Sequence, residues 1–377
     1  MLIGVPAETE PAETRVAATP ETVKKFMSLG AEMAVQQGAG IRAGIPDRDY
    51  VSAGARLVDA GTALGADVVL KVRRPTAEEL PELKAGAAVV AIMDPYGHVE
   101  AIDAIAKTGA AAFAMELMPR ITRAQVMDVL SSQANLAGYR AVIDAAAEYA
   151  RAMPMMMTPA GTVPAARLFV MGVGVAGLQA IATARRLGAI VTATDVRPAT
   201  KEQVESLGAK FVAVEDEEFK QAETAGGYAK EMSDAYKAKQ AELVASHIAK
   251  QDIVITTALI PGRPAPKLVS ADMVRSMRAG SVIIDLAVER GGNCELSQPG
   301  ETVVSDNGVR IVGYSNVTRL AATASALYAR NLYAFVETMI DKNAKAIAIN
   351  WDDELIKATC LTKGGAIVHP NFQSIPA

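Results

Sequence analysis

A glycine-rich loop constrains the fold of this chain more tightly than any other feature of its sequence. Gly172, Gly174 and Gly177 directly follow the apolar segment 168–171 and open a helical pattern over 176–187. In a strand–loop–helix unit of this kind, the first glycine permits a tight turn and the second lets a pyrophosphate approach the backbone. The third lets the helix pack closely against the strand. The segment therefore predicts a parallel α/β unit that binds a dinucleotide at the start of its helix.

An acidic residue, Asp195, ends the next predicted strand, which covers 190–194. A carboxylate at this point accepts hydrogen bonds from the adenosine ribose hydroxyls of a dinucleotide and repels a 2′-phosphate. The pattern therefore favours NAD(H) over NADP(H). Arg197 follows shortly afterwards and is a residue type that accommodates a 2′-phosphate, but Asp195 precedes it and NAD(H) remains the favoured ligand. The alternative interpretation is a glycine turn with a purely structural role.

The same alternation of short apolar segments and helical patterns runs through both halves of the chain. In the first third, the expected strands are 2–5, 34–36, 67–72, 87–93 and 111–117, and the expected helices are 19–29 and 98–108. Further along, the expected strands are 168–171, 190–194, 211–214, 253–257, 281–286 and 309–312. A chain of 377 residues also exceeds the size at which one core usually stops growing. We therefore expect an α/β fold of two Rossmann-like, doubly wound parallel-sheet domains separated by a cleft.

Three segments define the expected domain boundaries. A long helix over 136–152 is expected to bridge the two domains. The segment 153–164, rich in methionine and proline, is interpreted as a linker or a loop that crosses the cleft, with its methionines used for packing. The tail 344–377 has too few helical patterns to stand alone and is expected to return to the first domain. The predicted domains are 1–131 completed by 321–377, and an NAD(H)-binding domain over 132–320.

Composition excludes several classes of function. The formal net charge is −4 and there is no basic stripe, so we expect no nucleic-acid partner. Cys294 and Cys360 lie far apart without metal-ligand spacing, which indicates reduced thiols and no metal site. The N-terminus does not resemble a signal peptide, and no stretch approaches the ~20 apolar residues of a membrane helix. We therefore expect a soluble chain without direct membrane insertion.

The chain lacks an obvious general acid or base. Dehydrogenation of an alcohol or amine needs such a group beside the hydride donor, usually His, Lys or a tuned carboxylate. Of the three histidines, His98 starts a predicted helix, His247 lies inside a charged helix and His369 lies in the tail. None of them belongs to a motif, so we expect each to be structural or solvated.

An unusual polar run follows the last predicted strand of the first domain. It contains Arg120, Gln125, Asp128 and Ser131, which would face the second domain if the two sheets share a cleft. Arg120 and Asp128 are able to pair, while Gln125 and Ser131 are able to hydrogen-bond a carboxamide or a ribose. The alternative is a solvated interdomain loop, because nothing in the spacing specifies a reaction.

A second polar run, over 222–233, contains paired glycines. Gly226 and Gly227 favour a mobile loop that closes over the cofactor with Tyr228 at its tip. The alternative is a tolerated surface loop.

Several long motifs resemble one known family. They are RAQVMDVLSSQANLAGYRAV, MPMMMTPAGTVP, GVGVAGLQAIATARRLGA, TDVRPATKEQVESLGAKF, AETAGGYAKEM, TTALIPGRPAPKLV and GSVIIDLAVERGGNCE. Across essentially its whole length, the chain resembles the NAD(H)-binding component (domain I, alpha subunit) of proton-translocating NAD(P) transhydrogenase. The resemblance implies a homodimer that docks on a component holding NADP(H), attached to a membrane domain that conducts protons. It also implies direct hydride transfer between the two nicotinamides, in the cytoplasm at the inner face of a bacterial inner membrane.

The resemblance further implies roles for individual positions. The catalytic positions would be Arg120, Gln125, Asp128 and Ser131, which surround the nicotinamide and its ribose, with Gln125 reaching toward the partner's nucleotide. The implied cofactor-binding positions are Arg120, Ile121, Thr122, Gln125, Val126, Met127, Asp128, Ser131, Gly172, Val173, Gly174, Val175, Ala176, Gly177, Asp195, Val196, Arg197, Gly227, Tyr228, Gln240, Ala258 and Leu259. Transfer between two nicotinamides releases no substrate proton, which explains the missing acid or base.

Two other interpretations remain. The chain shares the N-terminal pattern of alanine dehydrogenase, including GVPAET and the LKV run at 70–72. However, the position of a catalytic lysine in that family is Arg73 here, and the position of its catalytic histidine is Asp94. An arginine stays protonated and cannot act as a base, which counts against that enzyme. The second alternative is a non-catalytic module that binds NAD(H) and a partner.

Overall fold

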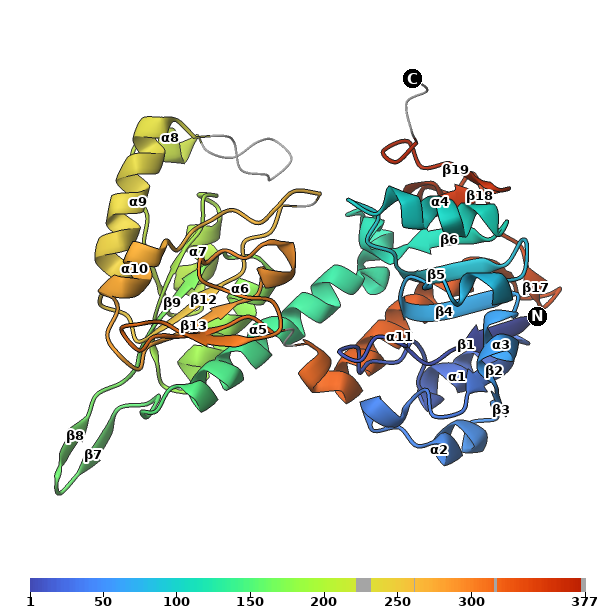
Figure 1. The fold of residues 1–377 in the computed structure, drawn as a ribbon, viewed down its shortest axis with the longest axis horizontal. Helices are drawn as coiled ribbons and strands as arrows, with labels where there is room; N and C mark the ends of the chain where they lie inside the picture. The colour runs from blue at the N-terminus through green and yellow to red at the C-terminus, as the bar shows by residue number, and fades with distance from the viewer. Residues whose placement is uncertain (222–231, 261, 315–316, 374–377) are drawn as a thin grey trace. The chain divides into compact units, whose positions relative to one another are not determined.

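The computed structural model describes residues 1–221, 232–260, 262–314 and 317–373 (Figure 1). These residues form two compact units. The first unit comprises Met1–Gln133 and Thr318–Ala377, and the second comprises Ala134–Val317. The boundary after Gln133 falls inside the longest helix, α5 (Val129–Glu148). Each unit contains its own sheet and its own apolar cores.

The first unit is built on a six-stranded parallel sheet in the order β3-β2-β1-β4-β5-β6. Its strands are β1 (Leu2–Val5), β2 (Glu32–Gln36), β3 (Arg56–Val58), β4 (Val68–Arg73), β5 (Ala88–Ile92) and β6 (Ala111–Ala114). The central strands bury nearly every side chain, as expected of a parallel sheet covered on both faces. This strand order is that of the Rossmann fold, which confirms the predicted fold class for this part of the chain.

Helices cover this sheet, and the C-terminal segment supplies two of them. The helices are α1 (Pro20–Ser28), α2 (Asp47–Ser52), α3 (Ala60–Leu64), α4 (Val99–Lys107), α11 (Ala321–Glu337) and α12 (Glu354–Thr359). Helix α1 begins with a reciprocal cap between Thr19 and Thr22, and Pro20 occupies its first turn. On α11, Tyr328 and Phe335 are completely buried in the core of the first unit. Helix α11 therefore belongs to this core although it is distant in sequence.

The chain after α12 covers the outer edge of the first sheet. Leu361 donates its N–H to the carbonyl of Ala112 at 2.8 Å, and Thr362 Oγ1 accepts from the N–H of Ala112 at 2.9 Å. These contacts satisfy the exposed backbone groups of β6, an edge strand that would otherwise be open to pairing with other chains. Small two-stranded ribbons complete the segment: β16 (Ile340–Asp341) with β17 (Ala346–Ile347), and β18 (Thr362–Lys363) with β19 (Ala366–Ile367).

The second unit contains a seven-stranded sheet in the order β11-β10-β9-β12-β13-β15-β14. Its strands are β9 (Arg167–Met171), β10 (Ile190–Thr194), β11 (Lys210–Phe211), β12 (Ile253–Thr256), β13 (Val282–Asp285), β14 (Thr302–Val304) and β15 (Arg310–Val312). The first five strands in sequence repeat the Rossmann order, and only the edge pair of β14 and β15 is antiparallel. The second doubly wound sheet is therefore also confirmed.

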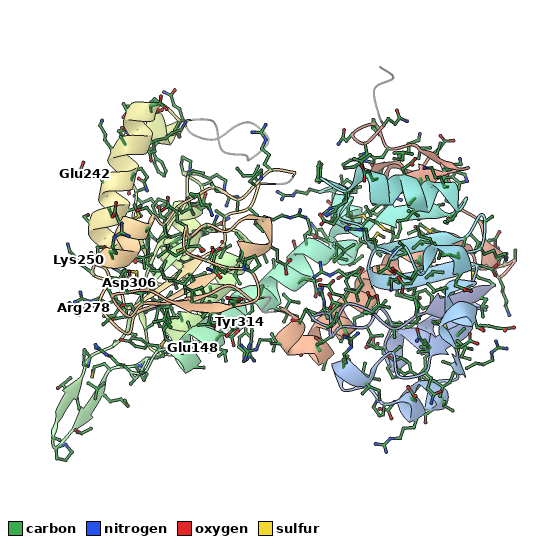
Figure 2. The ribbon with its side chains drawn as sticks, in the orientation of Figure 1. Glu148, Glu242, Lys250, Arg278, Asp306 and Tyr314 are labelled. Carbon is green, nitrogen blue, oxygen red and sulfur yellow. The ribbon has the colours of Figure 1, made fainter. Side chains whose placement is uncertain are left out.

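The helices of the second unit are α5, α6 (Val175–Arg186), α7 (Thr200–Ser206), α8 (Glu217–Lys220), α9 (Asp234–Ile248) and α10 (Ala271–Ser276). Glu148, near the end of α5 and labelled in Figure 2, forms an ion pair with Arg310 of β15 at 2.8 Å. Gly138 on α5 lies against the start of α6, since a Cβ there would approach the carbonyl oxygen of Ala176 to 2.0 Å. The C-terminal part of α5 is thus packed into this unit.

The segment 153–164 differs from the expected linker. It contains an antiparallel hairpin of β7 (Met156–Thr158) and β8 (Gly161–Val163). Pro159 and Ala160 form its two-residue turn, and Gly161, with φ +132°, begins β8 opposite Thr158. Met153 is buried in the core of the second unit, as the expected packing role requires. The other three methionines do not serve that role, because Met155, Met156 and Met157 are 56%, 43% and 80% exposed.

Other differences from the sequence-based prediction are local. The predicted strand at 111–117 ends at Ala114, because the chain turns there into a short 3-10 helix, Met115–Leu117. The short strands β3 and β14 and the helices α2 and α3 are additional to the predicted elements. Among the described residues, no helix combines the length and apolar character needed to cross a bilayer.

Candidate functional site

The candidate site of the second unit lies where the strand order reverses, between β9 and β12. In a doubly wound sheet, ligands bind at the carboxyl ends of the strands at this switch point. The chain leaves β9 at Gly172, leaves β10 at Asp195 and leaves β12 at Thr257 and Ala258. Thr257 Oγ1 donates to the carbonyl of Gly172 at 2.9 Å, which joins the two strand ends directly. The predicted glycine loop and acidic residue are thus placed at one edge of one sheet.

Each glycine of the loop has a separate physical role. Gly172 adopts φ +100°, and a Cβ there would also approach Thr257 Oγ1 to 2.6 Å. A Cβ on Gly177 would come within 1.9 Å of the carbonyl oxygen of Gly172, so only glycine permits this approach of helix to loop. A Cβ on Gly174 would meet no protein atom within 4 Å. Gly174 therefore faces open space at the first turn of α6, where the backbone N–H groups of a helix start favour an anion.

Both oxygens of Asp195 are engaged by neighbouring donors. Oδ2 accepts from the N–H of Val173 at 2.7 Å and from Arg197 Nη2 at 3.0 Å. Oδ1 accepts from the N–H and from Nε of Arg197, both at 2.9 Å. The carboxylate thus holds the glycine loop through Val173, and it binds the guanidinium of Arg197. Since a carboxylate offers about four lone-pair sites, ribose hydroxyls must compete with Arg197 for it.

A buried asparagine, which the sequence motifs did not identify as a site residue, supports the loop after β12. Asn293 is completely buried, and its Oδ1 accepts from the N–H of Ala258 at 3.0 Å. Its Nδ2 donates to the carbonyls of Ala258 and Pro266 at 2.9 and 2.8 Å. Asn293 therefore fixes the backbone of Ala258. The next residue, Leu259, is 53% exposed. In the sequence, Asn293 falls within the motif GSVIIDLAVERGGNCE, which by itself assigned it no role.

The remaining predicted positions of this unit have different surroundings. Val175 and Val196 are 40% and 49% exposed beside the glycine loop and Asp195. Gln240 on α9 accepts from the N–H of Val214 at 2.9 Å and donates to Thr194 Oγ1 at 3.2 Å, so it ties α9 to the end of β10. Gly227 and Tyr228, in the predicted loop over 222–233, lie outside the described residues.

The polar run of the first unit forms a 3-10 helix over Thr122–Met127, followed directly by α5. Asp128 precedes α5, and its carboxylate accepts from the N–H of Ser131 at 2.9 Å and from Ser131 Oγ at 2.5 Å. Two predicted site residues are therefore in direct contact and cap the helix. The predicted positions Arg120, Thr122, Gln125 and Val126 are exposed, while Ile121 is half-buried and Met127 is buried.

The carboxyl edge of the first sheet is occupied by internal ion pairs. The fully buried Glu13 binds Arg15 Nη2 at 2.6 Å and Arg73 Nε at 2.9 Å. Lys71, which is 1% exposed, binds Glu79 at 2.8 Å and lies 3.6 Å from Glu8. Arg15 and Arg73, the latter at the position of the alanine dehydrogenase lysine, are thus both bound by a carboxylate of the chain itself.

Burial and pairing shift the pKa values of these acids in opposite directions. Burial alone would raise the pKa of Glu13, but hydrogen bonds and charge from Arg15, with the charge of Arg73, hold it below its ordinary value. Burial raises the pKa of Glu8 despite the nearby charge of Lys71 and the N–H of Val72. The network is therefore ionised around Glu13 at neutral pH.

Position 94 carries an aspartate, and the imidazole of His98 lies beside it, with Nδ1 3.4 Å from Asp94 Oδ2. Asp94 adopts φ +48°, and its N–H donates to the carboxylate of Glu116. His98 Nδ1 lies 3.0 Å from the carbonyl oxygen of Asp94. In the second unit, His247 packs its ring against Phe169 and contacts Thr192 Oγ1 at 2.9 Å, and burial lowers its pKa. These two histidines have structural contacts, as the sequence indicated.

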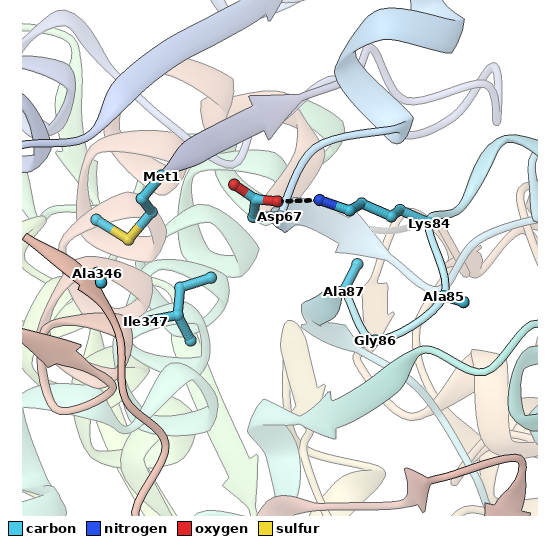
Figure 3. A pocket seen from close by; sticks show the side chains of 8 residues that line it. All are labelled: Met1, Asp67, Lys84, Ala85, Gly86, Ala87, Ala346 and Ile347. Carbon is cyan, nitrogen blue, oxygen red and sulfur yellow. Dashed lines mark hydrogen bonds and ion pairs between the residues drawn. The ribbon is translucent and has the colours of Figure 1, made fainter.

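The first unit contains a hollow of about 380 Å³. Figure 3 shows the side chains that line it. Its lining includes Met1, Asp67 and Ala87, which directly precede β1, β4 and β5. It therefore lies at the amino ends of the strands, opposite the edge where doubly wound sheets bind ligands. Its charged residues, Asp67 and Lys84, form an ion pair with each other. Among the described residues, no group of three or more His, Cys, Asp or Glu side chains is placed to hold a metal ion.

Comparison with known sequences matches nearly the whole chain to one family. The profile described as alanine dehydrogenase/PNT, N-terminal domain, matches residues 4–137, and that of the C-terminal domain matches residues 141–370. The chain is 58% identical to an NAD(P) transhydrogenase subunit alpha protein of Rhodospirillum rubrum, over 98% of both chains. It is 32% identical to alanine dehydrogenase of Mycobacterium tuberculosis, over 79% of this chain and 76% of that one.

A solved structure shows the same arrangement of elements. The transhydrogenase from Sinorhizobium meliloti is 62% identical in sequence and superimposes with a TM-score of 0.90. The match covers 98% of this chain and 100% of that one. The chain is thus more similar to the transhydrogenase proteins than to the alanine dehydrogenase.

Proposed function

Because this chain belongs to the alanine dehydrogenase/PNT family, we propose that it is the NAD(H)-binding component of a proton-translocating NAD(P) transhydrogenase. It passes hydride directly between its own NAD(H) and NADP(H) held by a partner component. The observation that carries the proposal is the glycine loop and Asp195 at the switch point of the second sheet, in a chain 58% identical to a transhydrogenase subunit.

The site fits a dinucleotide of the NAD(H) type. Gly174 leaves open space at the first turn of α6 for the pyrophosphate, and Val173, Val175, Ala176 and Gly177 complete the loop. Asp195 offers a carboxylate to the adenosine ribose, with Val196 and Arg197 beside it. The further contacts that we propose are Gly227, Tyr228, Gln240, Ala258 and Leu259.

We assign the nicotinamide end to the 3-10 helix of the first unit. Arg120, Gln125, Asp128 and Ser131 contact the nicotinamide and its ribose, with Ile121, Thr122, Val126 and Met127 around them. The bound dinucleotide supplies the hydride chemistry. The chain itself orients the ring through amide and hydroxyl groups, and it needs no residue that moves a proton.

The wider assembly is also proposed. The chain acts as a homodimer, it docks on components that bind NADP(H) and span the membrane, and hydride transfer is coupled to proton translocation. It works in the cytoplasm at the inner membrane of a bacterium through these partners. An alanine dehydrogenase activity is disfavoured because neither catalytic position of that pattern has the required residue. The lysine position is Arg73, which is bound by Glu13, and the histidine position is Asp94, shortly after β5.

Hydride exchange with and without the partner tests the function. In stopped-flow mixing, NADH on this chain should reduce an NADP analogue only when the NADP(H)-binding component is present. The chain alone should bind NADH and should not oxidise alanine. Reduction of pyruvate with ammonia by the chain alone would contradict the proposal.

Nucleotide preference tests the role of Asp195. The unaltered chain should bind NADH at least about tenfold more tightly than NADPH, because the carboxylate repels a 2′-phosphate. Asp195→Asn should narrow this preference, since the repulsion is lost and Arg197 loses the partner that holds it. Titration of nucleotide fluorescence measures both affinities. We expect Asp195→Asn to narrow the preference by binding NADPH more tightly than the unaltered chain does. In the Asp195→Asn/Arg197→Ala double variant, NADPH affinity should return to that of the unaltered chain. Equal affinities in the unaltered chain would refute the assignment.

A further inference from the structure

The 3-10 helix that carries Gln125 is longer than such helices usually are. It covers six residues, Thr122–Met127, whereas 3-10 runs beyond about four residues are uncommon because their hydrogen bonds have poor geometry. Its first and last backbone bonds measure 3.0 Å, from Ala124 to Ile121, and 3.4 Å, from Asp128 to Gln125. A segment of this kind needs support from the rest of the fold to keep one conformation.

The three-residue period of the helix separates its side chains into three rows. Ala124 and Met127 form one row and are buried, 1% and 4% exposed, in the core of the first unit. Gln125 and Asp128 belong to a second row, which stays accessible. Burial of the first row therefore determines the side of the helix on which Gln125 emerges.

The third row contains Arg123 and Val126, and the side chain of Arg123 is bound by the C-terminal segment. Both Nη atoms of Arg123 donate hydrogen bonds to the carboxylate of Asp353 at 2.8 Å, and Nη2 lies 3.3 Å from Glu354 Oε1. Asp353 is also the N-cap of α12 and accepts from the N–H of Leu355 at 2.8 Å. The start of the 3-10 helix is thus joined to the start of α12 by a bidentate ion pair with defined geometry.

The end of the 3-10 helix is held by α11. Asn331, which is 7% exposed, donates Nδ2 to the carbonyl of Val126 at 2.8 Å. Its Oδ1 accepts from Ser132 Oγ at 2.7 Å, in the first turn of α5. One buried amide therefore joins the last turn of the 3-10 helix to the helix that follows.

We propose that Arg123, Asp353 and Asn331 are positioning residues for hydride transfer: through them, α11 and α12 fix the 3-10 helix that presents Gln125. The inference rests on the proposed function, because it takes Gln125 as a group that contacts the nicotinamide. A displacement of reacting groups by about 1 Å can slow a reaction by up to about a hundredfold, so the support of this helix affects the rate. Positioning requires no contact between these three residues and the nucleotide.

Arg123→Gln tests the ion pair, and Arg330→Gln is its matched control. Arg330 is 51% exposed and binds Glu21 with a shortest contact of 2.6 Å, whereas Arg123 is 48% exposed. Both variants remove one positive charge from an exposed ion pair in the first unit. With the partner component present, Arg123→Gln should slow single-turnover hydride transfer by about 5- to 50-fold, as Gln125→Asn should. Arg330→Gln should leave the rate unchanged.

Two further readouts separate positioning from a merely structural role. The NADH dissociation constant of Arg123→Gln should stay within about twofold, and its melting temperature should match that of Arg330→Gln. Arg123→Lys should restore part of the rate, since it keeps the charge but loses the bidentate geometry. Asn331→Asp, which replaces the donor facing the Val126 carbonyl, should slow transfer more than Ser132→Ala.

Equal transfer rates in Arg123→Gln and Arg330→Gln, with active unaltered protein, would overturn the positioning role alone. A slower rate that is accompanied by an equal loss of NADH affinity would overturn it as well. Absence of partner-dependent transfer in the unaltered chain would refute the proposed function and this inference together.

Discussion

At the residue scale, buried charges in the first unit are satisfied by the chain itself. Glu13 is completely buried between Arg15 and Arg73, and removing one member of such a group leaves an uncompensated buried charge. Glu13→Gln should therefore destabilise the protein by about 3–5 kcal/mol at neutral pH. Thermal or urea unfolding measures the difference. Glu21→Gln, in an exposed ion pair, is the control and should change stability by no more than about 1 kcal/mol.

The effect of Glu13 should depend on pH in a defined direction. Its pKa is lower in the folded protein than the ordinary value of 4.5, so its ionised form is stabilised by folding. That stabilisation is complete above pH 4.5 and is lost as the pH falls through the folded pKa. The difference between the unaltered protein and Glu13→Gln should therefore shrink in acid. A difference that grows as the solution is acidified below that ordinary pKa would contradict this account.

At the element scale, two glycines of the loop have different roles. Gly177 is required for the packing of α6, whereas Gly174 is proposed to leave space for the ligand. A Cβ on Gly177 would lie 1.9 Å from a backbone oxygen, so Gly177→Ala should lower the melting temperature by displacing α6, at a cost of about 1–3 kcal/mol. A Cβ on Gly174 meets no protein atom, so Gly174→Ala should fold normally. Because that methyl group occupies the space proposed for the pyrophosphate, NADH affinity should fall by about tenfold or more.

Calorimetry and NADH titration on the two alanine variants provide the comparison. Unchanged NADH affinity in a stable Gly174→Ala protein would place the pyrophosphate elsewhere. A Gly177→Ala protein with unaltered melting temperature would show that the helix and loop are less closely packed than described.

At the scale of the whole molecule, the hairpin of β7 and β8 presents apolar side chains that its own unit does not cover. Three consecutive methionines, 155–157, are exposed there, and such patches mark contact surfaces. If the chain is a homodimer through this hairpin, Met155→Ser/Met157→Ser should shift it toward monomer in light scattering. Ile190→Ser, at a position 55% exposed, should leave the oligomeric state unchanged. A double variant that keeps the mass of the unaltered protein would exclude the hairpin as the interface.

Local sequence patterns were sufficient to predict the strands, glycine loop and helix proposed to bind the pyrophosphate and adenosine parts of the dinucleotide. Strands such as β4 and β9 are runs of apolar residues that are almost entirely buried, and their pattern is continuous in the sequence. The conformation of Gly172 and the position of Asp195 depend on a strand, a turn and a helix that follow one another directly. Short or partly exposed strands such as β3 lacked such a pattern.

The sequence by itself thus determined the glycine loop, the acidic residue after β10 and the two parallel sheets, because each is encoded within short stretches of consecutive residues. Only the tertiary structure decided how the polar run around Gln125 is held. Arg123 and Asp353 are 230 positions apart, and Asn331 is 205 positions from Val126. No periodicity or motif links residues at such separations. Their contacts exist because the C-terminal segment packs into the same core as β1–β6, which buries Ala124 and Met127 and brings α11 and α12 beside them.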